Sequence, residues 1–369
     1  MLDGMRSRRA FVLALLAARI ARPALAATAT SDTASRTGEA IRFPDGFGAH
    51  PDTRIEWWYV TGALEAAART WGFQITFFRA STGIVAAASN RFAARELVFA
   101  HAAVSDLEQR RLRHDQRIAR SGFGIAEAAL AATALKVRDW SLSRREIDGR
   151  SRYAARATSD VGAFAFDLSL AATQPILLQG QGGWSRKGPR REQASRYYSE
   201  PQLAVAGTLA LDGRSVAVTG RAWLDHEWSD AFLDPEAVGW DWIGMNLDDG
   251  AVLTAFRLRR ADGSMLWSGG SHRAAGGATR DFADGEVVFT PRRTWASPAS
   301  SARYPVEWIV ATPAGRFTVS SLLDDQELDS RASTGSIYWE GLSLLADTNG
   351  KRVGRGYLEM TGYAQRLVL

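Results

Sequence analysis

Residues 56–64 read Glu-Trp-Trp-Tyr-Val-Thr-Gly-Ala-Leu, and residues 72–79 read Gly-Phe-Gln-Ile-Thr-Phe-Phe-Arg. The first stretch is rich in aromatic and β-branched residues, which favour β-strands. In the second stretch Phe73, Ile75 and Phe77 recur at every other position, so they share one face of a strand. The two stretches therefore predict neighbouring strands with apolar faces.

The same pattern returns in the second half of the chain. Residues 240–247 read Trp-Asp-Trp-Ile-Gly-Met-Asn-Leu, and residues 250–257 read Gly-Ala-Val-Leu-Thr-Ala-Phe-Arg. In both places a strand with Trp and an acid is followed by a short turn, a Gly and an alternating strand that ends in Phe-Arg. Two similar β-barrel domains that divide near residues 210–235 explain this repeat. Chance similarity between two hairpins is the alternative, because strand patterns are degenerate.

The rest of the chain continues in short strand-like stretches separated by turns. Asp212-Gly213, for example, is a hairpin-turn signal between residues 203–209 and 216–220. An Ala-rich stretch at residues 125–135 is the exception, and the helix propensity of Ala favours a helix there. Many strands with few helical stretches are typical of barrels and sandwiches. We therefore predict an all-β chain.

The N-terminus has the parts of a secretory signal peptide in their usual order. Basic residues precede an apolar Ala/Leu run, and Ala-Leu-Ala at residues 24–26 supplies a cleavage site. Ser-Arg-Arg-x-Phe-Val-Leu at residues 7–13 looks like a twin-arginine export signal. We expect a twin-arginine signal peptide at residues 1–26, a flexible N-terminus at residues 27–42, and a periplasmic or secreted protein. The alternative is a basic N-terminal helix of the mature protein.

Composition and charge exclude several classes of function. The chain of 369 residues has no cysteine, which rules out disulfides, a thiol nucleophile and cysteine-ligated metals. Its formal net charge is +5, of which +4 lies in the first 26 residues. The remainder divides into +6 over residues 27–210 and −5 over residues 211–369, which is not the footprint of a nucleic-acid-binding protein. We expect neither a nucleic-acid partner nor a membrane-spanning segment.

The sequence also lacks the motifs of common enzyme classes. It contains no Gly-x-Ser-x-Gly, no phosphate-binding loop, no His-Glu-x-x-His, and no Gly-x-Gly-x-x-Gly after a strand. Five histidines are few for a His-rich metal centre, although a mixed His/carboxylate site could still form in the fold. We expect no cofactor and no metal.

Residues 221–230, Arg-Ala-Trp-Leu-Asp-His-Glu-Trp-Ser-Asp, and residues 239–242, Gly-Trp-Asp-Trp, form the densest group of acids and tryptophans. Burial among aromatic walls raises the pKa of a carboxylic acid, and a protonated carboxyl is what a general acid requires. In a strand Asp225 and Glu227 share one face, and His226 lies on the other. The alternative is a linker whose acids form buried ion pairs with arginines. The candidate catalytic residues are Asp225, His226, Glu227 and Asp241, and the candidate ligand-binding residues are Trp228, Trp240 and Trp242.

A second group lies at residues 50–59, His-Pro-Asp-Thr-Arg-Ile-Glu-Trp-Trp-Tyr. One interpretation puts Glu56 and Trp57 on a ligand cavity. The other is a plug that closes a barrel, in which Arg54 or another arginine clamps Glu56. His101 lies in an apolar strand, where a histidine more often belongs to the core than to a binding site. We include it among the candidate ligand-binding residues.

Several stretches together resemble one family, the AttH / carotenoid 1,2-hydratase (hydroxyneurosporene synthase) family of tandem lipocalin-like proteins. The resemblance covers about residues 43–366, and the stretches that show it are residues 50–62, 73–79, 100–101, 223–228, 239–242, 338–341 and 356–363. It implies two packed lipocalin-like β-barrels in tandem, at residues 43–225 and 226–369. It also implies a ligand cavity at or between them, because barrels of this size hold one small apolar ligand.

The resemblance leads to a first hypothesis about function. The family includes carotenoid hydratases, related hydratases, cyclisation catalysts, and secreted members encoded near transporter components. The export signal is similar to that of the last group. The first hypothesis is therefore an exported protein that binds a bulky hydrophobic molecule, isoprenoid or lipid-like, with an envelope transporter as the implied partner.

The second hypothesis is a hydratase-type lyase that adds water to a C=C bond. Protonation of carbon needs a desolvated acid, aromatic faces to stabilise the carbocation, and a base to direct water. Asp241 or Asp225 would be the acid, His226 or Glu227 would orient water, and the cation would be lined by Trp57, Trp228 and Trp240. The pairing requires Asp241 and His226 to face one cavity. A hydrolase needs a nucleophile or a metal, and the sequence supplies no recognisable one.

Overall fold

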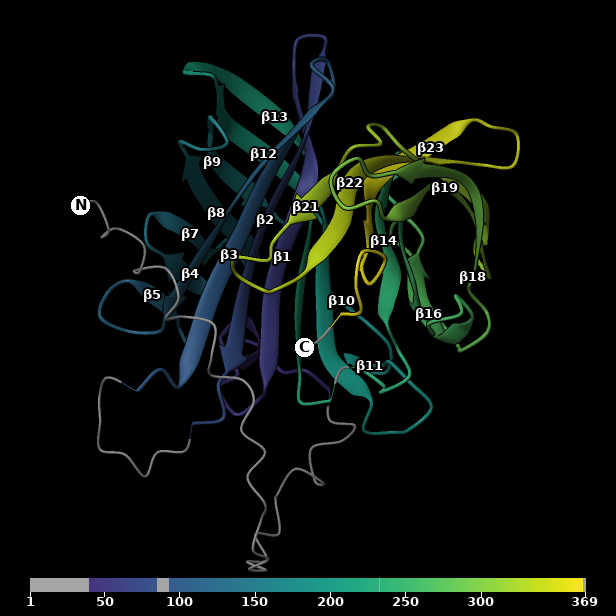
Figure 1. Cartoon of the computed structure of the whole chain (residues 1–369), viewed down its shortest axis with the longest axis horizontal. Helices are drawn as coiled ribbons and strands as arrows, with labels where there is room; N and C mark the ends of the chain where they lie inside the picture. The colour runs from purple at the N-terminus through teal and green to yellow at the C-terminus, as the bar shows by residue number, and fades with distance from the viewer. Residues whose placement is uncertain (1–39, 85–92, 232, 368–369) are drawn as a thin grey trace, which may run out of the picture. The chain divides into compact units, whose positions relative to one another are not determined.

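The computed structural model describes residues 40–84, 93–231 and 233–367. Apart from one short 3-10 helix, η2 (Asp45–Phe47), the regular elements of these residues are β-strands in two antiparallel sheets (Figure 1). The first sheet contains β1 (Ile55–Ala66), β2 (Arg69–Ser81), β3 (Glu96–Asp106), β4 (Arg111–Arg120), β5 (Ala126–Ala128), β6 (Ala134–Val137), β7 (Trp140–Ile147), β8 (Arg150–Ser159), β9 (Phe164–Ala171), β10 (Leu177–Leu178), β11 (Trp184–Arg186), β12 (Ala194–Leu211) and β13 (Arg214–Ser229). The second contains β14 (Gly239–Leu247), β15 (Val252–Arg259), β16 (Met265–Arg273), β17 (Thr279–Phe282), β18 (Val288–Ala296), β19 (Arg303–Thr312), β20 (Gly315–Ser321), β21 (Glu327–Asp329), β22 (Ile337–Ala346) and β23 (Arg352–Met360).

Each sheet brings its first and last strands together. The order in the first sheet is β4-β3-β2-β1-β13-β12-β9-β8-β7-β6-β5, and β10 and β11 also pair with β12. The order in the second is β17-β16-β15-β14-β23-β22-β20-β19-β18, with β21 on β22. In each sheet the strand that comes first in the chain therefore pairs with the strand that comes last, β1 with β13 and β14 with β23. This pairing is expected when a sheet of sequential strands curls into a barrel. The chain is all-β, with two lipocalin-like barrels, which we call the first barrel (β1–β13) and the second barrel (β14–β23).

The strands at the centre of the first barrel are buried on both faces. Along β1, Trp58 and Val60 belong to the core of the first barrel. Tyr59 and Ala63, on the opposite face, belong to a separate apolar cluster that also contains Trp242 of the second barrel. Successive side chains of a strand point to opposite faces, so one face of β1 fills its barrel and the other packs against the second barrel.

The second barrel is built in the same way. Ile243 and Met245 of β14 lie in its own core with Trp308. Trp242 directly precedes Ile243, so its side chain points to the opposite face of β14. There it lies with Phe256 in the cluster that joins the two barrels. The inter-barrel cluster therefore comes from the outward faces of the central strands of both sheets.

Three sequence-based expectations concern segments of this fold. The predicted helix at residues 125–135 is wrong, because β5 and β6 occupy this stretch. Ala126, Leu135 and Val137 are fully or nearly fully buried in the core of the first barrel. The burial of these apolar side chains in the sheet outweighs the weak helix propensity of Ala. The predicted domain boundary between residues 225 and 226 falls inside β13, whereas the chain changes sheet after Ser229. The predicted signal peptide at residues 1–26 and the adjoining residues up to 39 lie outside the described residues.

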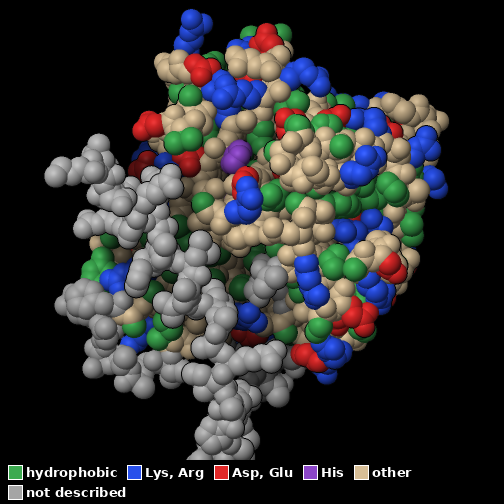
Figure 2. All heavy atoms as spheres, viewed as in Figure 1, with side chains coloured by type: hydrophobic (Ala, Val, Ile, Leu, Met, Phe, Trp, Pro, Cys, Tyr) green, Lys and Arg blue, Asp and Glu red, His purple; other side chains and the backbone are tan. Residues whose placement is uncertain are grey.

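Two surface features bear on the expected partners. No helix within the described part of the chain is long and apolar enough to cross a membrane. On the face of the molecule in Figure 2, basic and acidic side chains are interspersed. The expectation that the protein has no nucleic-acid partner stays a prediction.

Candidate functional site

A cavity of about 290 Å³ is lined by residues of both barrels. Its walls come from β1, β2, β3, β12 and β13 of the first barrel and from β14, β15, β22 and β23 of the second, and many of the lining side chains are aromatic. A mostly apolar cavity with a few polar groups is the usual form of a site for a small apolar molecule. The apolar and aromatic side chains that line it include Ile55, Trp57, Tyr59, Phe78, Ala80, Phe99, Trp240, Trp242, Phe256, Leu258 and Leu367.

Strand alternation decides which polar side chains reach this cavity. In the β1–β13 pair, Trp57 lies opposite Glu227 and Tyr59 lies opposite Asp225. All four line the cavity. Their neighbours Trp58, Val60 and Leu224 point into the core of the first barrel instead, because successive side chains point to opposite sides of a sheet.

Asp225 is a buried carboxyl group held by three donors. Its Oδ1 accepts hydrogen bonds from Ser199 Oγ at 2.5 Å and from Trp223 Nε1 at 2.7 Å. Its Oδ2 accepts one from Tyr197 Oη at 2.8 Å. Burial outweighs these bonds and raises the pKa of Asp225 to about 7. Near neutral pH this carboxyl can therefore both give and take a proton.

Glu227, on the same face, is held in a different way. Lys187 Nζ lies 3.0 Å from its Oε1, and Ser195 Oγ donates to the same oxygen. Lys187 is itself buried and packs over the ring of Phe256 at 4.2 Å. A buried charge is tolerated when it is paired, so this pair places a cation and an anion on the cavity wall.

A second pair of carboxyl groups lines the cavity from the other barrel. Glu340 of β22 and Glu359 of β23 occupy directly opposite positions. Burial, with the negative charges of Asp225 and Glu227, raises the pKa of Glu359 to about 8. Burial, with the charge of Glu359, raises the pKa of Glu340 well above its usual range. Ionisation of both neighbouring carboxyl groups is unfavourable, because the two negative charges repel each other. Glu340 and Glu359 therefore hold at least one proton at neutral pH.

The cavity brings together most, but not all, of the residues predicted from the sequence. Lining it are Asp225, Glu227, Glu56, Trp57, Trp240, Trp242 and His101. Asp241, His226 and Trp228 are not part of its wall as described. The predicted pairing of Asp241 with His226 on one cavity therefore does not form.

Asp241 lies on the face of β14 that belongs to the second barrel. Its carboxylate is 2.7 Å from Arg257 Nε and 3.1 Å from Arg259 Nε. It also accepts a hydrogen bond from Tyr363 Oη at 2.8 Å. Two arginines and a phenol thus hold the carboxylate within the barrel.

The internal repeat seen in the sequence explains this position. Glu56 pairs across β1 and β2 with Arg79, and Asp241 pairs across β14 and β15 with Arg257. In each barrel, the acid of the first hairpin strand forms an ion pair with the Phe-Arg arginine of the second, at 2.8 Å and 2.7 Å. The anticipated clamp on Glu56 is therefore provided by Arg79.

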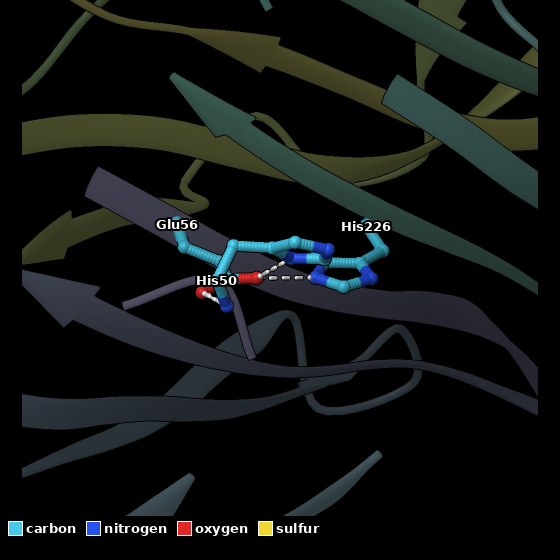
Figure 3. A group of neighbouring side chains, drawn as sticks. All are labelled: His50, Glu56 and His226. Atoms are coloured by element: carbon cyan, nitrogen blue, oxygen red, sulfur yellow. Dashed lines mark hydrogen bonds and ion pairs between the residues drawn. The ribbon is translucent and has the colours of Figure 1, made fainter. Parts of the chain in front are cut away.

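Glu56 also joins the two histidines shown in Figure 3. His50 Nδ1 lies 2.7 Å and His226 Nε2 2.8 Å from Glu56 Oε1, while Arg79 donates to Oε2. Although burial opposes it, these hydrogen bonds hold the pKa of Glu56 far below its usual range. Burial lowers the pKa of His226 to about 4, so that its ring stays neutral. In the described residues, the three metal-ligand-type atoms of this cluster lie within 4.8 Å of one another. They already satisfy one another by hydrogen bonds, and we assign them no metal.

His101 connects the two barrels at the cavity wall. Its Nδ1 lies 2.9 Å from Tyr338 Oη, and its Nε2 lies 2.8 Å from Ser333 Oγ. Burial lowers the pKa of His101 to about 3, so the ring is neutral. Its place in an apolar strand is therefore that of a buried, hydrogen-bonded histidine that also borders the cavity.

Sequence reasoning missed several polar groups of the cavity, Lys187, Tyr197, Gln74 and Glu340 among them. Lys187 and Tyr197 come from a loop and a strand that contain no motif, while Gln74 and Glu340 come from opposite barrels. Glu340 left one signal in the sequence, since it is an acid among apolar strand residues. The other three are recognisable only after the barrels are packed together.

Two antiparallel barrels with a shared aromatic cavity define a tandem lipocalin-like protein. The chain belongs to the AttH-like family, whose profile matches residues 34–363. No protein of curated function matches the sequence.

Three solved structures share this fold. An AttH candidate from Nitrosomonas europaea is 47% identical, with a TM-score of 0.81 over 88% of this chain and 98% of its own. Kievitone hydratase from Nectria haematococca is 16% identical, with a TM-score of 0.68 over 90% of this chain and 95% of its own. CghA in complex with Sch210972 is 12% identical, with a TM-score of 0.51 over 85% and 89%. The last two similarities concern the fold alone.

Proposed function

We propose that this protein is a hydratase-type lyase that adds water to, or removes it from, a C=C bond of a bulky apolar molecule in the inter-barrel cavity. The observation behind the proposal is the set of buried carboxyl groups on an aromatic wall, with the pKa of Asp225 raised to about 7 and that of Glu359 to about 8. Burying such groups is unfavourable, and binding of a hydrophobic molecule does not require them. A general acid operating near neutral pH requires them.

Two carboxyl groups on the same face of β13 have different roles in this reaction. Asp225, held by Ser199, Tyr197 and Trp223, is placed to transfer a proton to carbon. Glu227 is kept in place by Lys187 and is the candidate base that orients water. The faces of the lining tryptophans stabilise positive charge on the substrate.

The second candidate is a carrier of a hydrophobic ligand, which the apolar lining favours. The two functions differ in one measurement. Ligands that co-purify with the protein are identified by mass spectrometry and incubated with it in isotope-labelled water. A lyase incorporates the label into the wild-type product, and Asp225→Asn loses incorporation while it retains the ligand. A carrier incorporates none in either form. Asp160→Asn, an exposed carboxyl, is the matched control.

We also propose that the protein is exported through the twin-arginine route and works in the periplasm or outside the cell, with an envelope transporter as partner. The support is the Arg8-Arg9 leader and the absence of cysteine from the sequence. Fractionation of cells that express the wild-type chain should find it in the periplasm. Changing both leader arginines to lysine should hold it in the cytoplasm, and an unchanged distribution would contradict the proposal.

A further inference from the structure

Lys187 differs from the other polar groups of the cavity because it is a buried primary amine. The chain has 45 Lys and Arg residues, of which only Lys136, Lys187 and Lys351 are lysines. Lys136 and Lys351 are exposed, whereas Lys187 is 3% exposed and lines the inter-barrel cavity. The two acids related by the internal repeat pair with Arg79 and Arg257. The ion pair on the cavity wall differs from these two in using a lysine.

The two cations differ in chemistry. Either would place a positive charge beside Glu227, and arginine suits a purely structural pair better, because its planar fork donates two parallel hydrogen bonds to a carboxylate. A guanidinium keeps its proton and is not a nucleophile. A lysine amine can release a proton and bond to the carbon of a carbonyl group, and lysines in apolar pockets are used in this way. The lysine therefore points to a use for the amine itself.

The fold fixes the position of this amine at the wall. Lys187 directly follows β11, and its backbone N–H donates to the carbonyl oxygen of Gln193 at 2.7 Å. Its Nζ lies 4.2 Å from the ring centre of Phe256 and 4.8 Å from that of Tyr197, and both rings line the cavity. Glu227 Oε1, 3.0 Å from Nζ, is the counter-ion. The wall thus stabilises a positively charged nitrogen at the surface of an apolar cavity.

We infer that the cavity captures an apolar aldehyde or ketone as a Schiff base on Lys187. This reaction goes beyond the proposed hydration and does not depend on it. A protonated Schiff base keeps one positive charge on Nζ, so the carboxylate of Glu227 and the two aromatic rings that hold the ammonium also stabilise the product. The apolar lining favours a carbonyl compound with a bulky hydrophobic group.

The step conserves charge and needs no oxidant or reductant. Glu227 takes one proton from the ammonium, and the amine nitrogen then bonds to the carbonyl carbon. The nitrogen gives a second proton to the oxygen, and Glu227 returns the first, so that the oxygen leaves as one water molecule. A C=N double bond replaces the C=O double bond. The third ammonium proton stays on the nitrogen together with the positive charge.

Reductive trapping with 2-naphthaldehyde tests the inference, because this apolar aldehyde has no alkene that could react with an amine instead. The full chain is incubated with the aldehyde and sodium cyanoborohydride, which reduces an imine to a stable amine, and the labelled residues are mapped by mass spectrometry. Lys187 should carry the naphthylmethyl group at roughly ten times the level of Lys136 and Lys351 or more, because the cavity holds the aldehyde beside the amine.

The unmodified chain contains the matched controls. The alcohol 2-naphthalenemethanol cannot form an imine but fits the same space, so it should lower the label on Lys187 and leave the two exposed lysines unchanged. In concentrated urea all three lysines should be labelled alike. Equal labelling of the three in the folded protein, or an unlabelled Lys187, would overturn the inference. Either result would leave the proposed hydration standing, since hydration requires no covalent bond.

Variants give a second readout, which a merely structural role would not move. Lys187→Arg keeps a cation beside Glu227 and should lose the cavity label, while Lys351→Arg should keep it. Without reductant, the bound imine should absorb at the long wavelength of a protonated Schiff base. Glu227→Gln removes the counter-ion, so the imine should lose its proton and absorb at shorter wavelength. An absorption band that is the same in both proteins would contradict the assignment of Glu227.

Discussion

Replacing Asp225 with Asn should remove catalysis and, at the same time, make the folded protein more stable at alkaline pH. The reason is that the wild-type carboxyl is buried, at 4% exposed, and has a pKa of about 7 instead of its usual 3.8. Its folded-state pKa is higher than its unfolded-state pKa, so the folded state binds the proton more tightly. The wild type therefore loses stability as the pH rises from 3.8 to 7.

The size of the effect follows from the pKa difference. Each unit corresponds to about 1.4 kcal/mol, so, relative to a pH well below 3.8, the raised pKa of Asp225 lowers the free energy of unfolding of the wild type by about 1.5 kcal/mol at pH 5, where only the unfolded state is ionised, and by about 4 kcal/mol at pH 8. Asn cannot ionise, and if its carbonyl oxygen keeps the hydrogen bonds from Ser199 and Trp223, its amide nitrogen meets the Tyr197 hydroxyl, which costs about 1–2 kcal/mol at every pH. The free energy of unfolding of the variant relative to wild type should therefore rise by roughly 2–3 kcal/mol between pH 5 and pH 8.

Urea denaturation at pH 5, 6, 7 and 8, followed by tryptophan fluorescence, measures this difference. Asp160→Asn serves as the control, because that carboxyl is exposed, and its difference from wild type should be flat with pH. A flat difference for Asp225→Asn as well, or one that falls as the pH rises, would refute the argument. It would mean that Asp225 is ionised in the folded protein, and with it the proposed general acid would be lost.

Three further substitutions test the assignments around the site. Glu56→Gln should lower the free energy of unfolding by about 3 kcal/mol, because it removes the buried carboxylate partner of Arg79 and leaves only Glu96, at 3.1 Å, to balance that guanidinium; a loss below about 1 kcal/mol in urea denaturation would contradict the clamp. The same substitution should flatten the loss of stability on acidification below pH 4.5, since the lowered pKa of Glu56 makes its contribution present above that pH and lost below it. Asp241→Asn should also destabilise the protein but leave the affinity for a cavity ligand unchanged, and a tenfold loss of affinity by calorimetry would show that this acid reaches the ligand after all. Lys187→Met should abolish label incorporation from water while the ligand still binds, because it removes the buried cation that holds the Glu227 carboxylate in place; unchanged incorporation would exclude Glu227 as the base.

Much of the site was predictable from strand alternation. The sequence places Asp225 and Glu227 on one face of a strand and His226 on the other, and the structure has them so, with the first two on the cavity and the third inside the first barrel. Asp241 was the harder case, because acids in Trp-rich strands look alike in sequence. The internal repeat indicates the position of Asp241, because Asp241 corresponds to Glu56 in the repeat. Both acids are paired with the arginine of the following strand.

The sequence by itself determined the all-β class, the tandem repeat and the family, because these depend on local alternation and on ordered motifs. It could not determine which face of each central strand would meet the other barrel. That choice was made by the packing of the two barrels, which buries β1 and β13 on both faces and turns Asp225 and Glu227 toward the second barrel. The same packing brings Gln74 of the first barrel within 2.6 Å of Glu340 of the second, residues separated by 266 positions. Burial of Glu340 between the barrels, with the charge of Glu359 beside it, keeps the pKa of Glu340 well above its usual range, and that burial exists only in the tertiary structure.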